Sequence, residues 1–211
     1  MHKKDYDAVV VGSGPNGLAA AIVLRQKGLT VLLIERKRKI GGGLCTEELT
    51  LPGFLHDTCS AIHPMAAGSP FFQTLPLEKF GLQFIFPPLD AAHPFDHDTA
   101  AVLKRSVAET AAILEDKAYP ELIQPLLKSW PGVIKDILGP LHFPEHPIDM
   151  ARFGLSALSS AQHLARRFST PRARGLWAGM AAHGMQPLSR CTTAAIGLVL
   201  GIALAVMRLS D

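Results

Sequence analysis

The sequence predicts an α/β fold in which a strand–helix–strand unit is followed by a mainly helical region. Two observations predict the unit: an apolar run at 8–11 leads into a glycine-rich turn, and a second apolar run at 30–34 ends on Glu35. A third observation predicts the helical region, because residues 106–182 contain helix-start motifs and amphipathic stretches.

The first apolar run has no polar residue at alternate positions. Such a run is typical of a parallel strand that is buried on both faces. Gly12, Gly14 and Gly17 follow with the spacing G-x-G-x-x-G. In this motif the first glycine permits a sharp turn, the second lets a pyrophosphate approach the backbone, and the third lets the helix pack closely on the strand. Pro15 suits the first turn of that helix, and Gly28 suits its end.

The spacing of these residues predicts a Rossmann-like dinucleotide site. A helix N-terminus offers unpaired N–H groups and a partial positive charge to a pyrophosphate. A carboxylate in the position of Glu35 can accept hydrogen bonds from both hydroxyls of an adenosine ribose, and it would repel the 2′-phosphate of NADP. The alternative is a glycine turn in an α/β protein that binds no nucleotide.

A second glycine-rich segment follows the acid. The basic residues 36–39 lead into the triple glycine 41–43. Glycines permit positive φ angles and close backbone approach, which suits a long dinucleotide that needs backbone donors. The alternative is a solvated basic loop. The alternating residues 46–54 end in a turn and predict a hairpin.

Composition excludes several classes of function. The net charge of +3 is small and no basic stripe is interleaved with aromatic residues, so we expect no nucleic-acid partner. The three cysteines, Cys45, Cys59 and Cys191, are widely spaced, which indicates neither a zinc site nor a redox pair. With no signal peptide at the start of the sequence, we expect a reduced, cytoplasmic protein.

Five stretches together resemble one family: residues 12–17, 35–36, 41–43, 52–57 and 60–64. On these residues the chain resembles the phytoene desaturase-related FAD-dependent oxidoreductases. The branch is the one labelled NAD(P)/FAD-dependent oxidoreductase, or pyridine nucleotide-disulphide oxidoreductase domain-containing protein. The resemblance continues at residues 69–70, 77–82, 178–183 and 187–188, and it covers most of residues 5–200. It implies a FAD-binding segment over 1–69 and a substrate or cap region over 70–211, truncated at the carboxyl end.

The resemblance also implies the roles of individual residues. FAD pyrophosphate would lie against the first turn, Glu35 and Arg36 would frame the adenosine ribose, and Gly42 and Gly43 would line the path to the flavin. The predicted cofactor-binding residues are Gly12, Ser13, Gly14, Pro15, Asn16, Gly17, Glu35, Arg36, Gly42 and Gly43. Amine-oxidase relatives often have arginine at the place of Gly43, which argues against an amine-oxidase assignment.

The function implied by the resemblance is an FAD-dependent oxidoreductase that abstracts a hydride from a small apolar substrate, by desaturation or dehydrogenation. No residue is assigned as a catalytic base. The competing hypothesis is a truncated nucleotide- or partner-binding fragment without turnover.

Residues 70–105 are predicted to contain two short strands, 82–86 and 100–104. His93, Asp96, His97 and Asp98 are predicted to form a polar turn rather than a metal site, so we expect no metal.

Four signals divide the helical region. A capping box at Ser106–Glu109 predicts a helix that stops near 119–120, and Pro125 and Pro131 predict a short or kinked segment after it. An amphipathic stretch at 148–168 predicts one helix. Thr170 followed by Pro171 predicts another that runs to about Ala182.

Residues 192–207 are almost wholly apolar. They are fewer than the roughly 20 residues that cross a bilayer, so we expect a buried core helix and no membrane span. Because members of the family are longer, the resemblance implies that the chain is an incomplete, amino-terminal portion. Left uncovered, the apolar side of this stretch would provide a surface for self-association.

Overall fold

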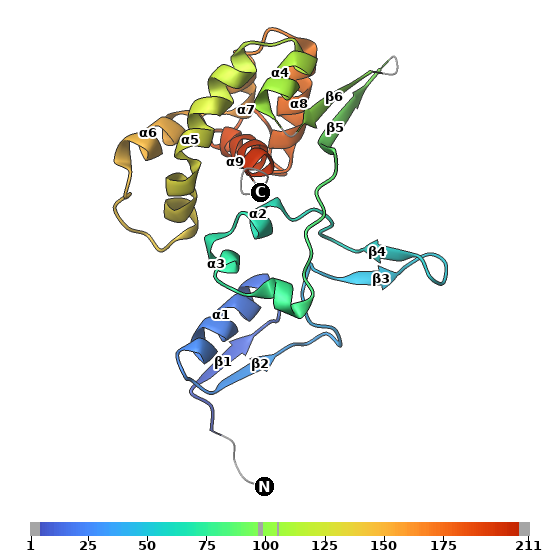
Figure 1. Cartoon of the computed structure of the whole chain (residues 1–211), viewed down its shortest axis with the longest axis vertical. Helices are drawn as coiled ribbons and strands as arrows, with labels where there is room; N and C mark the ends of the chain where they lie inside the picture. Colours follow the sequence, from blue (N-terminus) through green and yellow to red (C-terminus); the bar gives the residue numbers. More distant parts are fainter. Residues whose placement is uncertain (1–4, 97–98, 105, 207–211) are drawn as a thin grey trace. The chain divides into compact units, whose positions relative to one another are not determined.

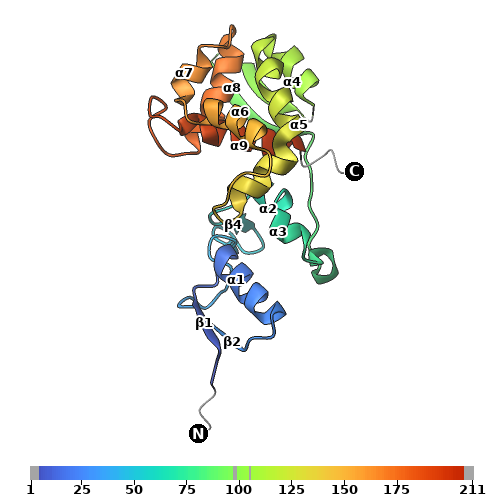
Figure 2. The same cartoon turned by 90° about the vertical axis from the view of Figure 1, so that its left-hand side faces the viewer.

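The computed structural model describes residues 5–96, 99–104 and 106–206. Figures 1 and 2 show the chain from two sides. The chain divides into two compact units, Met1–His63 and Pro64–Asp211. This division falls a few residues before the boundary expected from the sequence at 69/70.

The first unit is built on two parallel strands and one helix (Figure 1). Strand β1 (Ala8–Val11) leads into helix α1 (Pro15–Gln26), and strand β2 (Val31–Ile34) returns beside β1. The register pairs Ala8 with Val31 and Val11 with Ile34. These elements lie where the apolar runs and the glycine motif predicted them, so the strand–helix–strand unit is confirmed.

Burial of β1 on both faces was a wrong prediction. Ala8 and Val10 are half-buried, whereas Val9 is 56% exposed and Val11 is 81% exposed. Within the described residues this sheet has two strands, and α1 packs against them. The side chains that alternate away from the helix therefore remain exposed, although their chemistry is that of a buried strand.

Side-chain hydrogen bonds join the amino-terminal ends of the two strands. Asp7 Oδ2 accepts from the Thr30 backbone N–H at 2.7 Å and from the Thr30 hydroxyl at 2.6 Å. The hydroxyl bond, followed by the backbone bond, lowers the pKa of Asp7. The predicted hairpin is also present: β3 (Thr46–Glu48) pairs antiparallel with β4 (Leu55–Asp57).

The second unit begins with short helices and a strand pair. In chain order, its elements are α2 (Pro64–Ala67), α3 (Pro70–Gln73), the 3₁₀ helix η1 (Leu77–Phe80), β5 (Leu89–Phe95), β6 (Thr99–Lys104), α4 (Val107–Leu114), α5 (Ala118–Leu138), α6 (Pro147–Ala157), α7 (Ala161–Ala165), α8 (Pro171–Ala182) and α9 (Thr193–Val206).

The predicted strand at 82–86 was wrong, and the strand at 100–104 was confirmed. Strand β6 pairs antiparallel with β5, which occupies the proline-rich stretch expected to be a turn. His93 therefore lies on a strand, where its ring packs against Gly179 of α8. Burial, followed by the charge of His183, lowers the pKa of His93. His97 and Asp98 lie outside the described residues.

The helical region differs from its prediction in three places. The helix that starts after Ser106 ends at Leu114 instead of near 119–120, because the chain turns at Glu115, whose φ is +53°, and α5 begins at Ala118. Helix α5 continues through Pro125 and Pro131 for 21 residues, so the segment is not short. Its apolar stripe, which includes Leu122 and Trp130, is buried, and this burial offsets the missing N–H groups. The predicted single helix at 148–168 is two helices, because the Ser160 hydroxyl caps a new start by accepting from the His163 backbone N–H. The predicted start of α8 at Thr170 and Pro171 is confirmed.

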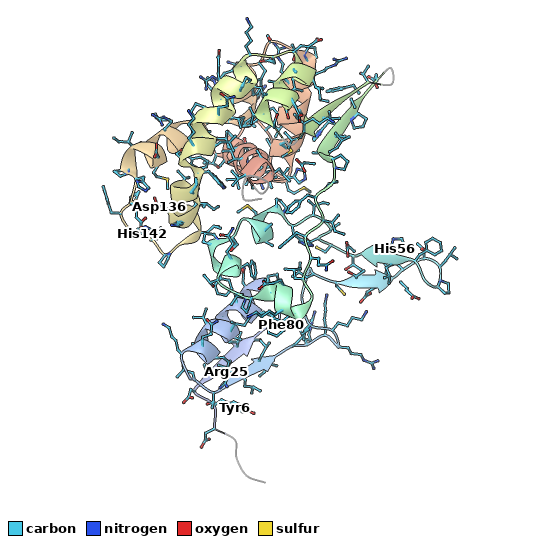
Figure 3. The ribbon with its side chains drawn as sticks, in the orientation of Figure 1. Tyr6, Arg25, His56, Phe80, Asp136 and His142 are labelled. Atoms are coloured by element: carbon cyan, nitrogen blue, oxygen red, sulfur yellow. The ribbon has the colours of Figure 1, made fainter. Side chains whose placement is uncertain are left out.

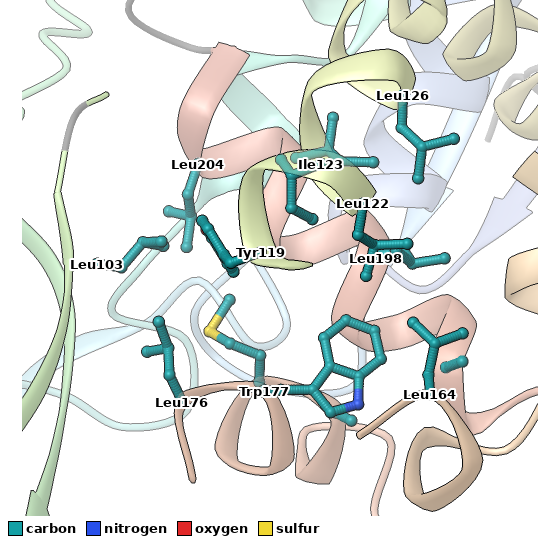
Figure 4. Packing of buried hydrophobic residues seen from close by; sticks show 14 of the residues in the cluster. Leu103, Tyr119, Leu122, Ile123, Leu126, Leu164, Leu176, Trp177, Leu198 and Leu204 are labelled. Atoms are coloured by element: carbon teal, nitrogen blue, oxygen red, sulfur yellow. The ribbon is translucent and has the colours of Figure 1, made fainter. Parts of the chain in front are cut away.

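Helix α9 lies in the core of the second unit, as expected for a buried helix. It packs against α5, α6, α7 and α8. Figure 4 shows its Leu198 and Leu204 among buried side chains of α5, α7 and α8. Leu198 and Ile202 have no exposed surface. The apolar side of this stretch therefore packs within the unit. No helix among the described residues is long and apolar enough to span a membrane.

The loop between α5 and α6 contains a histidine with an acceptor at each ring nitrogen. His142 Nδ1 lies 2.6 Å from the Pro140 carbonyl oxygen, and His142 Nε2 lies 2.9 Å from Asp136 Oδ1 (Figure 3). The carbonyl oxygen is an acceptor only, and so is the Asp136 carboxylate when it is ionised, so this arrangement favours the protonated, cationic ring. The Pro140 bond, followed by the Asp136 bond, raises the pKa of His142.

We expect the NMR titration midpoint of His142 to lie above the usual value of about 6.5. Because the folded-state pKa is raised, the stabilisation from this cation is complete below the unfolded pKa and is lost as the pH rises through the folded pKa. Asp136→Asn should lower the midpoint, because the amide no longer carries the negative charge. A midpoint at or below the usual value in the unmodified chain would contradict the assignment of a cationic ring.

Candidate dinucleotide-binding site

The glycine turn has the geometry that its motif predicts. Gly12 has a φ of +97°, which favours glycine. A Cβ on Gly17 would lie 2.0 Å from the Gly12 carbonyl oxygen, so the start of α1 packs directly on the turn. No side chain larger than hydrogen fits at position 17 without moving the backbone.

The N-terminus of α1 is open to an anion. Pro15 occupies the first turn, and no side chain caps the helix at Gly14. A Cβ on Gly14 would have no atom within 4 Å, so space lies beside the backbone at this position. An uncapped helix N-terminus next to such space fits the pyrophosphate of a dinucleotide.

Glu35 stands at the carboxyl end of β2 and turns back toward the glycine turn. Its Oε2 accepts from the Ser13 backbone N–H at 2.8 Å and from the Ser13 hydroxyl at 2.7 Å. Its Oε1 accepts from the Lys37 backbone N–H at 2.8 Å. The Lys37 bond is the largest cause, followed by the Ser13 hydroxyl, of a pKa lowered to about 2.

The low pKa has a consequence for the charge of the site. Because the folded-state pKa of Glu35 lies below its usual 4.5, the contribution of the carboxylate to stability is present above pH 4.5 and is lost as the pH falls through about 2. Near neutral pH the site therefore carries a full negative charge, which a ribose hydroxyl can approach and a 2′-phosphate cannot.

The hydrogen bonds of Glu35 also limit how many hydroxyls it can accept. A carboxylate has about four acceptor positions. Three donors from Ser13 and Lys37 already lie within hydrogen-bond distance. The Arg36 backbone N–H is a further, minor donor to the carboxylate. A contact with both ribose hydroxyls, as the sequence predicted, therefore requires a shared position or the displacement of a present bond.

The second glycine segment contacts the first. The Gly41 backbone N–H donates to the Ser13 carbonyl oxygen at 3.0 Å. A Cβ on Gly42, whose φ is +62°, would lie 2.9 Å from Gly14 Cα. Gly43 faces Cys59 instead, since its Cβ would lie 3.4 Å from the Cys59 sulfur.

The structure brings together most of the residues that the sequence predicted. Gly12, Ser13, Gly14, Pro15, Gly17, Glu35 and Gly42 surround the start of α1. Asn16 and Arg36 are exposed beside them. Sequence reasoning left out Gly41, whose φ of +111° and bond to Ser13 connect the two turns. The triple glycine was the signal that could have identified it.

Comparison with a family model places an NAD(P)-binding Rossmann-like domain over residues 10–75. A pyridine nucleotide-disulfide oxidoreductase domain-containing protein 2 from Rattus norvegicus is 40% identical over 81 residues, which are 38% of this chain and 14% of that protein. One of the chains of limonene dehydrogenase from Castellaniella defragrans is 35% identical over 100 residues, 47% of this chain and 18% of its own length.

The chain is also similar in sequence to a transhydrogenase and in fold to an oxidase of known structure. A soluble pyridine nucleotide transhydrogenase of Escherichia coli is 51% identical over 51 residues, 24% of this chain and 11% of that protein. Among solved structures, putrescine oxidase bound to putrescine aligns with a TM-score of 0.55 and 22% identity, over 93% of this chain and 41% of that one. At this identity the alignment shows a shared fold. In each comparison the match spans less than half of the other protein.

Proposed function

Since the chain resembles the amino-terminal portion of oxidoreductases of the pyridine nucleotide-disulfide oxidoreductase domain-containing type, we propose that it binds FAD through the adenosine half of the cofactor. We further propose that it serves an FAD-dependent oxidation, by desaturation or dehydrogenation, of a small apolar substrate. The three cysteines are free, in keeping with the cytoplasmic location that we also propose.

One observation carries the proposal: two glycine turns and a fixed carboxylate converge on an uncapped helix N-terminus. The first turn provides space beside Gly14, and Gly42 closes on the same residue from the second turn. Glu35 is held at the neighbouring strand end. Each part suits a different portion of an adenosine dinucleotide, namely the pyrophosphate and the ribose.

The same residues favour FAD over NADP. The ionised Glu35 would repel a 2′-phosphate. The second glycine turn provides backbone that can follow a longer ligand beyond its pyrophosphate. Bound FAD supplies the redox chemistry as a hydride acceptor, and the residues described above bind and orient it.

A second candidate function is nucleotide or partner binding without turnover. It is favoured because the described site supplies groups for an adenosine ribose and a pyrophosphate, and no catalytic base is assigned in it. Self-association also stays a prediction.

Ligand titration distinguishes these functions. We would titrate the purified chain with FAD, NAD and NADP by isothermal calorimetry, and record the visible absorbance of the protein as purified. Tight binding of FAD, weaker binding of NAD and no binding of NADP would support the proposal. Binding of FAD without reduction by any apolar substrate would favour the second function, and no binding of any dinucleotide would refute both nucleotide-binding hypotheses.

We expect Glu35→Ala to weaken FAD binding by about ten-fold or more, because a ribose hydroxyl loses a charged acceptor. Calorimetry measures the change. Glu48→Ala is the matched control, since it removes the same charge from an exposed position on β3. If both variants bound FAD as the unmodified chain does, Glu35 would have no role at the ribose.

A further inference from the structure

We infer that Ser13 is a positioning residue, which supports nucleotide binding by holding the Glu35 carboxylate for the ribose instead of contacting the pyrophosphate itself. This inference rests on the proposed function of the site. It replaces the role at the pyrophosphate that the family resemblance implied for Ser13.

Burial is the first argument. Ser13 has no exposed surface, although it lies between Gly12 and Gly14, which are partly exposed. A ligand that lies beside Gly14 therefore meets glycine backbone. The Ser13 hydroxyl is directed to Glu35, which follows β2.

The second argument is that Ser13 has no donor left for a phosphate. Its backbone N–H and its hydroxyl both donate to Glu35 Oε2, at 2.8 and 2.7 Å. Its carbonyl oxygen accepts from the Gly41 N–H at 3.0 Å. The hydroxyl lone pairs that remain are acceptors, and a phosphate oxygen offers no proton to them.

The third argument concerns the carboxylate. Two donors from Ser13 occupy Oε2, so that oxygen is turned inward and Oε1 is left to face a ligand. The Lys37 N–H occupies one acceptor position on Oε1. Removing the Ser13 hydroxyl leaves the carboxylate held only by the backbone N–H groups of Ser13 and Lys37. The looser carboxylate then binds a ribose hydroxyl at Oε1 less well.

The test compares two ligands that differ only in the ribose. ADP carries both ribose hydroxyls, and 2′,3′-dideoxy-ADP carries neither but keeps the diphosphate. We expect Ser13→Ala to weaken ADP by about three- to ten-fold in calorimetry, because a bond to a charged group is lost, and to leave dideoxy-ADP within about two-fold. Equal weakening of both ligands would show that Ser13 acts on the phosphates. No change for either ligand would show that it has no role.

A double variant guards against a folding defect. In the Glu35→Ala background, Ser13→Ala should cause no further loss of ADP affinity, because its partner is already absent. A further loss there would overturn the inference. The Glu35 carboxyl resonance should also titrate at a higher pH in Ser13→Ala than in the unmodified chain. If the unmodified chain bound neither ADP nor FAD, the proposed function itself would fail, an outcome distinct from any change seen only in the variants.

Discussion

Replacing Gly17 by alanine is expected to disrupt the first unit, at a cost of about 3 kcal/mol or more in its free energy of unfolding. The new Cβ would lie 2.0 Å from the Gly12 carbonyl oxygen. That oxygen belongs to the backbone, so the clash cannot be relieved by a side-chain rotation, and the cost falls at the upper end of the range for overpacking. Hydrogen exchange at the Gly12 amide, which donates to the Ile34 carbonyl oxygen at 2.8 Å, measures the loss.

Gly14→Ala is the control for this change. Its Cβ would have no atom within 4 Å, and the φ of −67° suits alanine. We expect hydrogen exchange in β1 and β2 to change little and FAD affinity to fall, because the methyl group enters the space proposed for the pyrophosphate. Gly14→Val should lower the affinity further. If Gly17→Ala exchanged as slowly as the unmodified chain, the close packing of the helix on the turn would be wrong.

Replacing Ile202 by alanine is expected to lower the free energy of unfolding of the second unit by about 2–5 kcal/mol. Ile202 has no exposed surface, and it lies on α9, which packs against α5, α6, α7 and α8. The substitution removes buried methyl groups and leaves a cavity. Urea unfolding followed by tryptophan fluorescence measures the change, because Trp130 and Trp177 both lie in the same core.

Ile196→Ala makes the same chemical change on the same helix. Ile196 is 38% exposed, so less apolar area is lost and water fills the gap. We expect a loss of less than about 1 kcal/mol, partly offset by the better helix propensity of alanine. Equal losses for the two variants would contradict the burial of α9 in the core.

In the candidate site, the local sequence pattern predicted the backbone elements but not every side-chain contact. The sequence located β1, α1, β2 and the glycine turn, because apolar runs and turn chemistry are properties of short stretches. It assigned Ser13 to a ligand, whereas the structure directs that side chain to Glu35. A bond across two strand ends depends on their spacing in the folded unit, which no residue type reveals by itself.

The same distinction holds in the helical unit. The caps at Ser106 and Thr170 were predictable, because a hydroxyl that accepts from an N–H three residues later is a local event. The continuity of α5 through Pro125 and Pro131 was not predictable. The free energy that stabilises this helix comes from burial of its apolar side chains in the core, which depends on the rest of the unit.

The sequence by itself determined that this chain forms a parallel β–α–β unit with a glycine turn, a terminal acid and a buried apolar helix. Periodicity, turn chemistry and apolar content are properties of short stretches, so these features could be predicted without a fold. Only the tertiary structure decided that Val9 and Val11 are exposed, that Gly41 and Gly42 meet the first turn, and that Ser13 holds Glu35. Each depends on which distant segments pack together, because burial and hydrogen bonding are set by the neighbours in space.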